Sequence, residues 1–80
     1  MHIKLKAFGI ARDILGGGEV DFQWEGRADV TTLQKALLVQ YPRFQNVASI
    51  KIAVNEAYGL PDQLIGPEDE IVVIPPVSGG

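Results

Sequence analysis

One segment of this chain carries a complete helical stripe of apolar residues, and strand-like segments surround it. The stripe recurs at the three- and four-residue spacing of an amphipathic helix, at Val30, Leu33, Leu37 and Tyr41. Asp29 precedes it as an N-cap, and Pro42 ends it, because proline disfavours helical geometry in the residue before it. One helix can cover only one face of one sheet, so the fold must be a sheet with a helix on one side.

Segments with the alternating pattern of strands lie on both sides of this helix. We expect strands at His2–Phe8, Glu19–Glu25, Ile50–Val54, Ala57–Leu60 and Glu70–Ile74. The first two are close in sequence and should pair antiparallel, with a helical turn over Gly9–Leu15 between them that stops at glycines 16–18. The remaining segments should be a connector over Arg43–Ser49, anchored by Phe44 and Val47, and a loop over Pro61–Glu68.

The order β-β-α-β-β-β predicts an α+β fold of the β-grasp type, with a mixed sheet of about five strands and one main helix on one face. The apolar run 71–74 suits a central position beside the first strand. If Ile71 and Val73 face the helix, Val72 and Ile74 face away, and Phe8 does the same on the first strand. Either this apolar face binds a partner or loops fold over it, and the pattern leaves both interpretations open.

Length and composition restrict the possible functions. Eighty residues make one domain, residues 1–80, and 46% hydrophobic with 21% charged residues is typical of a soluble globular chain. The net charge is −3 and the basic residues form no cluster, so we expect no nucleic-acid partner. The sequence contains no signal peptide and no apolar run of spanning length, so we expect no membrane partner and a cytoplasmic location.

Few residues could carry chemistry by themselves. The chain has no cysteine, so it has neither a thiol nucleophile nor a cysteine metal site, and we expect no bound metal. His2 is a lone terminal histidine, and the three adjacent carboxylates of Glu68–Glu70 are typical of a solvated turn. Glycines 16–18 lead into a strand, whereas a phosphate-binding loop opens a helix, so we interpret them as a flexible turn.

The C-terminus has a composition of its own. Pro75 and Pro76 stiffen the exit from the last strand and remove two N–H donors. Val77 can anchor in a shallow apolar pocket, and Ser78 has no base in any plausible geometry. Gly79 and Gly80 lack a Cβ, so they could pass through a narrow channel. Residues 75–80 could therefore be a flexible, functional tail that ends in the reactive carboxylate of Gly80, but a terminal Gly-Gly also occurs by chance, and composition alone leaves both interpretations open.

Four stretches together resemble one family. The sequences IVVIPPVSGG, AVN, AFGIAR and DVTTLQKAL are similar to those of molybdopterin synthase small subunits, which are ubiquitin-like sulfur carriers related to the thiamine sulfur carrier. The resemblance covers essentially the whole chain, and the terminal PPVSGG is its most specific part. Gly66-Pro-Glu-Asp-Glu departs from it, since the family usually has glycine directly before Asp-Glu; this changes a turn and leaves the tail unaltered.

The resemblance implies a carrier that is not catalytic alone. A ubiquitin-activating-like adenylyltransferase would use ATP to adenylate the carboxylate of Gly80, and a sulfur donor would convert it to a thiocarboxylate. The chain itself would bind no cofactor. The tail, residues 75–80, would then insert into the large subunit of molybdopterin synthase, in a heterotetramer, and give its sulfur to the pterin precursor. Phe8, Tyr58 and Ile74 would form the apolar partner surface. Arg12 matches a family arginine of uncertain role, with a surface ion pair as the plain alternative.

Other functions remain open. A thiamine-pathway carrier would have the same terminus and activation but another acceptor. The Pro-Pro-Val-Ser spacer and the long segment Tyr41–Ser49 favour molybdopterin synthase over that pathway. A ubiquitin-like modifier joined to lysines, or an interaction domain with an inert Gly-Gly, are further alternatives.

Overall fold

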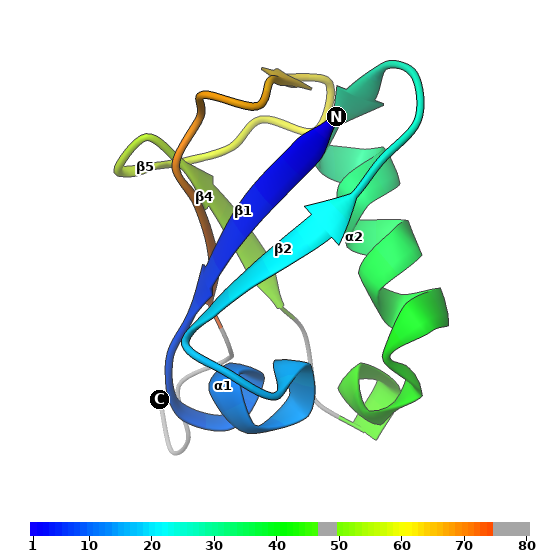
Figure 1. Ribbon diagram of the computed structural model, residues 1–80, viewed down its shortest axis with the longest axis vertical. Helices are drawn as coiled ribbons and strands as arrows, with labels where there is room; N and C mark the ends of the chain where they lie inside the picture. Colours follow the sequence, from blue (N-terminus) through cyan, green and yellow to red (C-terminus); the bar gives the residue numbers. More distant parts are fainter. Residues whose placement is uncertain (47–49, 75–80) are drawn as a thin grey trace.

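A computed structural model describes residues 1–46 and 50–74 of the chain. Its elements are ordered along the chain as in Figure 1. They are β1 (His2–Ala7), α1 (Gly9–Leu15), β2 (Glu19–Gln23), β3 (Ala28–Asp29), α2 (Val30–Gln40), the 3₁₀ helix η1 (Pro42–Asn46), β4 (Lys51–Val54), β5 (Ala57–Tyr58), β6 (Leu64–Ile65) and β7 (Ile71–Ile74). The predicted α+β class with one main helix is therefore confirmed.

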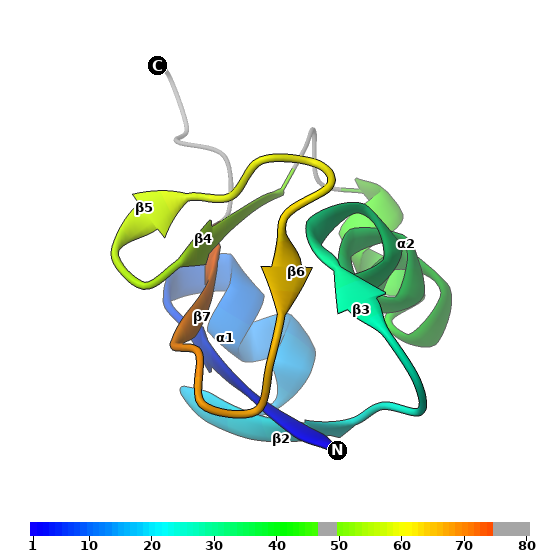
Figure 2. The same cartoon turned by 90° about the horizontal axis from the view of Figure 1, so that it is seen from above.

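Five strands form a mixed sheet in the order β2-β1-β7-β4-β5. The central strand, β7, runs parallel to its neighbour β1, with Leu5 opposite Ile71 and Ala7 opposite Val73. The pairs β1–β2, β4–β7 and β4–β5 are antiparallel. The last strand thus lies beside the first in the middle of the sheet, as the sequence predicted. Both α1 and α2 lie on one side of this sheet (Figure 2).

Helix α2 begins and ends where the sequence indicates. The Asp29 carboxylate accepts a hydrogen bond from the backbone N–H of Thr32 at 2.8 Å, and the Thr32 hydroxyl accepts one from the Asp29 N–H at 3.0 Å. This capping box satisfies the backbone N–H groups of Asp29 and Thr32 at the start of the helix. The Thr32 N–H, which is the main cause, lowers the pKa of Asp29 below its usual 3.8. Tyr41, directly before Pro42, leaves helical geometry at φ −123° and ψ 80°.

The core lies between the sheet and the helices. Leu33 and Leu37 of α2 are fully buried, and Phe44 of η1 is buried in the same core, which confirms it as an anchor of the connector. Val47, the second predicted anchor, lies outside the described residues. The sheet contributes the inward-facing residues of its strands, which include Ile3, Leu5, Phe22, Ile52, Val54, Ile71 and Val73. The described part of the chain buries no charged or polar residue in this core.

Two short strands were missed by the sequence analysis. β3 and β6 pair antiparallel as a separate two-stranded sheet beside α2 (Figure 2), inside segments expected to be turns or loops. Each has only two residues, too few for an alternating pattern. They hold the long loop after β5 against the start of α2, where the N–H groups of Val30 and Thr31 donate to the carbonyls of Gln63 and Pro61.

Some predicted strand ends were wrong. β1 stops at Ala7, and Phe8 instead precedes α1, where its carbonyl accepts from the N–H groups of Ala11 and Arg12. Gly9 makes this turn possible with φ +55°. β5 also ends early, at Tyr58, although the Gly59 N–H still donates to the Ile52 carbonyl.

Candidate partner-binding face

The face of the five-stranded sheet opposite α2, here called the open face, is apolar over β4, β5 and β7. Val72 and Ile74 of β7 point to it and are half-buried, whereas Ile71 and Val73 on the same strand are completely buried under the helices. A hollow of about 420 Å³ lies here, lined by Ala53, Glu56, Ala57, Tyr58, Glu70, Val72 and Ile74. The alternation predicted for the last strand is therefore confirmed, and no described helix covers its outer side.

The hairpin of β4 and β5 brings Tyr58 into this hollow. Asn55 and Glu56 form its two-residue turn with φ +53° and +72°, the values of the type I′ turn that suits antiparallel hairpins. Tyr58 then lies opposite Ala53, and the residue is 68% exposed. The Lys51 ammonium lies 5.8 Å from the ring centroid, within cation–π distance.

The structure brings together two of the three residues expected at a partner interface. Tyr58 and Ile74 line the same hollow. Phe8 is 64% exposed, but it follows the end of β1, precedes α1 and is not among the residues that line the hollow. Phe8 and Ile74 were expected side by side on neighbouring strands. β1 and β7 are neighbours, but their pairing ends at Ala7 and Val73, because the chain turns into α1 after Phe8.

The rest of the open face is charged. On β1, Lys4 and Lys6 lie opposite Asp21 and Glu19 of β2. A second hollow on this side is lined by charged residues and one proline, namely Lys4, Lys6, Glu19, Pro67, Glu68, Asp69 and Glu70. Glu70 therefore lies between the apolar and the charged halves, because it lines both hollows.

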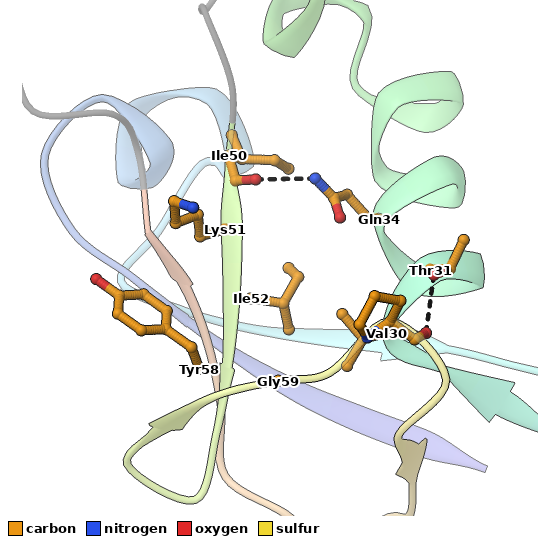
Figure 3. A pocket seen from close by; sticks show the side chains of 9 residues that line it. Val30, Thr31, Gln34, Ile50, Lys51, Ile52, Tyr58 and Gly59 are labelled. Atoms are coloured by element: carbon orange, nitrogen blue, oxygen red, sulfur yellow. Dashed lines mark hydrogen bonds between the residues drawn. The ribbon is translucent and has the colours of Figure 1, made fainter.

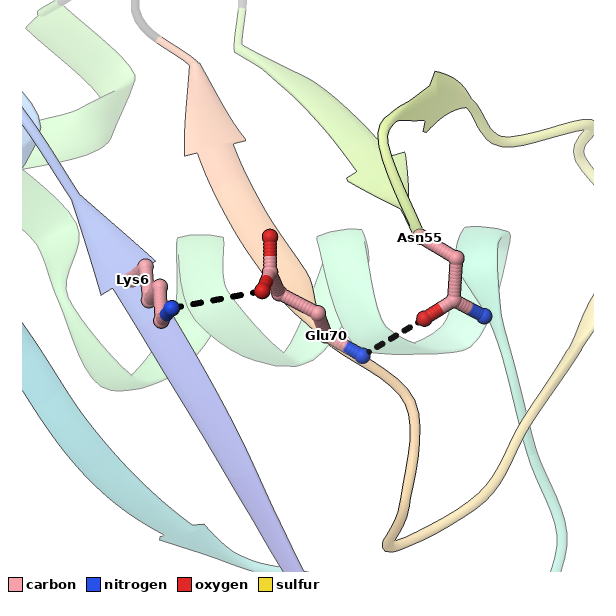
Figure 4. A network of polar contacts seen from close by, with 3 residues as sticks. All are labelled: Lys6, Asn55 and Glu70. Atoms are coloured by element: carbon pink, nitrogen blue, oxygen red, sulfur yellow. Dashed lines mark hydrogen bonds and ion pairs between the residues drawn. The ribbon is translucent and has the colours of Figure 1, made fainter.

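A polar network holds Glu70 in this position (Figure 4). Its N–H donates to Asn55 Oδ1 at 2.9 Å, and its carbonyl accepts from the Asn55 N–H at 2.9 Å. The Glu70 carboxylate pairs with Lys6 Nζ at 3.3 Å, with both side chains nearly half exposed, at 44% for Lys6 and 46% for Glu70. The Asn55 side chain also donates to Asp69. The backbone at Glu70 is thus fixed from the turn of the neighbouring hairpin.

Asp69 explains the unusual turn Gly66-Pro-Glu-Asp-Glu. Its carboxylate accepts from the Gly66 N–H at 2.7 Å and from Asn55 Nδ2 at 2.9 Å. These two bonds, the Gly66 N–H first, lower the pKa of Asp69 below its usual 3.8. The Glu70 carboxylate pairs with Lys6 instead, so the carboxylates of Asp69 and Glu70 do not meet at one point. Within residues 1–46 and 50–74, no three His, Asp or Glu side chains gather as a metal site would require.

A smaller groove lies at the same β4–β5 edge of the sheet, between α2 and β4 (Figure 3). Its volume is about 240 Å³, and Lys51, Tyr58, Gln34 and Thr31 surround a floor that includes Ile52 and Val30. Gln34 Nε2 donates to the Ile50 carbonyl at 2.8 Å. This bond occupies a carbonyl at the edge of the sheet, which blunts the edge against strand addition.

Other candidates have structural roles. Gly16 ends α1 at φ +86°, and the N–H groups of Gly16 and Gly17 both donate to the Arg12 carbonyl, as in a helix C-cap. Arg12 itself is exposed, and the one ion pair found among residues 1–46 and 50–74 is Lys6–Glu70. The surface ion pair considered for Arg12 is therefore not formed in this part of the chain. No helix of the described residues is long and apolar enough to span a bilayer.

The predicted tail, Pro75, Pro76, Val77, Ser78, Gly79 and Gly80, lies outside the described residues. The structure shows where it begins: Ile74 is opposite Lys51 at one end of β7, beside the hollow of the open face.

The sheet order and the crossing helix define a ubiquitin-like β-grasp protein. The structure superposes on a Pyrococcus furiosus protein assigned as molybdopterin converting factor, subunit 1, with a TM-score of 0.82 at 24% identity, covering 96% of this chain and 99% of that one. It also matches the small archaeal modifier protein 1 of Methanosarcina acetivorans, with a TM-score of 0.72 at 27% identity over 99% of this chain and 96% of that one.

The chain belongs to the ThiS family, whose model matches residues 5–80. It is 32% identical to the molybdopterin synthase sulfur carrier subunit of Caenorhabditis elegans, covering 100% of this chain and 99% of that protein. It is 27% identical to the subunit of the same name from Arabidopsis thaliana, covering 100% of this chain and 84% of that one. The resemblance found in the sequence is confirmed by these matches.

Proposed function

We propose that this chain is the sulfur carrier subunit of a molybdopterin synthase and that it carries sulfur on the carboxylate of Gly80. The observation that carries this proposal is the end-to-end match to the Caenorhabditis elegans sulfur carrier subunit, at 32% identity. The absence of cysteine from the sequence is consistent with it, because sulfur held on the backbone terminus needs no thiol.

The proposed chemistry takes place on partners. In an adenylyltransferase, an oxygen of the Gly80 carboxylate attacks the α-phosphorus of ATP and displaces pyrophosphate. Hydrosulfide released by a sulfur donor then attacks the carbonyl carbon of the acyl adenylate. The new C–S bond replaces the C–O bond to AMP, which leaves, and the product is a thiocarboxylate. In the large synthase subunit this group gives its sulfur to the pterin precursor, and water restores the carboxylate. The chain supplies a carrier and a docking surface, and the heterotetramer with the large subunit supplies catalysis.

The open face is the proposed docking surface for these partners. An apolar hollow that contains Tyr58 and Ile74 lies directly beside the point where the tail begins. A partner that covers the hollow would bury apolar surface while it receives the tail. Phe8, exposed beyond the end of β1, would extend the contact.

The carrier role is tested by changing the tail alone. We expect Gly79→Val to abolish sulfur transfer by the reconstituted synthase, because a branched Cβ would block a narrow channel. Deletion of Gly80 should have the same effect, since it shortens the tail by one residue and moves the terminal carboxylate back to Gly79. The melting temperature should stay unchanged in both variants, and Ser78→Ala is the matched control in the tail. Full synthase activity in Gly79→Val would contradict the proposal.

A second candidate, a ubiquitin-like modifier, is favoured by the match to the small archaeal modifier protein 1 of Methanosarcina acetivorans. Intact-mass analysis of the chain from its native host separates the two. A carrier should show the mass of a sulfur-for-oxygen exchange at Gly80, whereas a modifier should appear joined to lysines of other proteins. A thiamine-pathway carrier would also show the exchange, and the large subunit or other acceptor that co-purifies with the chain then names the pathway.

A further inference from the structure

We propose that Glu70 selects the partner of the open face, and that a partner cation replaces Lys6 on the Glu70 carboxylate when the two proteins dock. This inference rests on the proposed function, since it takes the large synthase subunit as the partner. It adds the chemistry of that partner: an apolar surface bordered by a lysine or arginine that meets Glu70.

The charge around the apolar hollow indicates a basic partner. The charged residues that line it are Glu56 and Glu70, both acidic, while the basic Lys51 lies opposite Ile74 and 5.8 Å from the Tyr58 ring. The side of the hollow that carries Glu56 and Glu70 is therefore complementary to a basic group of a partner, and complementary charge at a rim gives specificity and faster association.

Glu70 is better prepared for this role than Glu56. Both backbone polar groups of Glu70 are bonded to Asn55 at 2.9 Å, and its carboxylate is already held by Lys6 at 3.3 Å (Figure 4). Its carboxylate is therefore placed at the border of the hollow before a partner arrives. A group that is ordered beforehand loses less conformational entropy on binding. Glu56, in contrast, lies in the exposed hairpin turn.

The Lys6–Glu70 pair can be exchanged at low cost. Both side chains are nearly half exposed, at 44% and 46%, and such pairs contribute little to the stability of a fold. Glu19 lies directly opposite Lys6 on β2 and lines the same charged hollow. When a partner cation takes Glu70, the Lys6 ammonium can therefore turn to Glu19 and stay paired.

The inference predicts effects of opposite sign for the two members of one ion pair. Glu70→Gln should weaken binding to the large subunit about three- to tenfold and reduce its dependence on salt, because one charge contact is lost. Lys6→Gln should strengthen binding about two- to fivefold, because the internal competitor for Glu70 is removed. Glu68→Gln, which removes a carboxylate from the charged hollow only, is the matched control and should change affinity by less than about twofold.

The experiment measures affinity for the purified large subunit by calorimetry at two salt concentrations, with melting temperatures for every variant. Weaker binding by Lys6→Gln, or equal affinities in all variants, would overturn the inference while leaving the carrier role intact. No binding by the unmodified chain would overturn the inference and the proposed function together. A purely structural ion pair would lower the melting temperature in both variants without moving the affinities in opposite directions.

Discussion

The two faces of the central sheet are made by the same strands but differ in what covers them. On β7, Ile71 and Val73 lie under the helices with no exposed surface, while Val72 and Ile74 point to the open face and stay half-buried. Among the described residues, the covered face buries no charged side chain, whereas the open face combines an apolar hollow with a charged hollow lined by residues of β1 and β2 and by Glu70. The first face therefore stabilises the fold, and we expect the second to recognise partners.

The largest difference between the faces should appear when isoleucine is truncated on each of them. Ile71→Ala removes a fully buried side chain and should cost about 2–5 kcal/mol of unfolding free energy, because it leaves a cavity in the core. Ile74→Ala removes the same atoms three residues later on the open face, where solvent can fill the space. Its cost should be less than about half as large. Denaturant unfolding of both variants checks this, and equal losses would show that the open face is also core.

A smaller effect is expected at Gly59, which directly follows β5 and lies close to Val30 at the start of α2. A Cβ at Gly59 would lie 2.6 Å from Val30 Cγ2 and 3.2 Å from Val54 Cγ2, both on buried side chains. Gly59→Ala should therefore destabilise the fold by about 1–3 kcal/mol through overpacking. Gly17→Ala is the control, since its nearest neighbours would lie at an ordinary 3.8 Å. A Gly59→Ala variant with unchanged thermal unfolding would mean that the segment after β5 packs less closely on α2.

The smallest effect concerns the polar turn at the border of the open face. The pKa of Asp69 is lowered in the folded state, so its ionised form stabilises the fold above the ordinary value of 3.8. This contribution is lost as the pH falls below 3.8 and through the folded pKa. The stability difference between the wild type and Asp69→Asn should therefore shrink with decreasing pH. Asp62→Asn, a change of the same charge in the exposed loop, controls for net charge, and a difference that is constant with pH would contradict the assignment.

Much of this architecture could be predicted from the sequence because its signals are long and periodic. The α2 stripe, the Asp29 cap and the apolar run of β7 each follow from side-chain spacing, and together they place β7 beside β1. Ile74 and Tyr58 were expected on the outer apolar surface and line its hollow. The two-residue strands β3 and β6 could not be predicted, because their pairing depends on contacts between distant segments.

The polar contacts at the border of the candidate site also could not be predicted from the sequence pattern. Glu68–Glu70 reads as a run of solvated carboxylates, yet Asp69 turns to Gly66 while Glu70 turns to Lys6. This division depends on Asn55, which approaches from a different hairpin through three-dimensional packing. Phe8 was assigned to the strand because it continues the alternation, but the turn at Gly9 takes it into the start of α1.

The difference between the two faces of the sheet is tested most directly by placing the same charge on β7 once on the covered face and once on the open face, and by measuring both folding and binding. Val73→Asp puts an unpaired carboxylate into the core and should unfold the domain. Ile74→Asp, one residue later, should keep a cooperative thermal transition but weaken binding to the large subunit by about 2–4 kcal/mol, roughly thirty- to a thousandfold. If Ile74→Asp unfolds the chain as Val73→Asp does, or binds the large subunit with full affinity, the open face is not the docking surface.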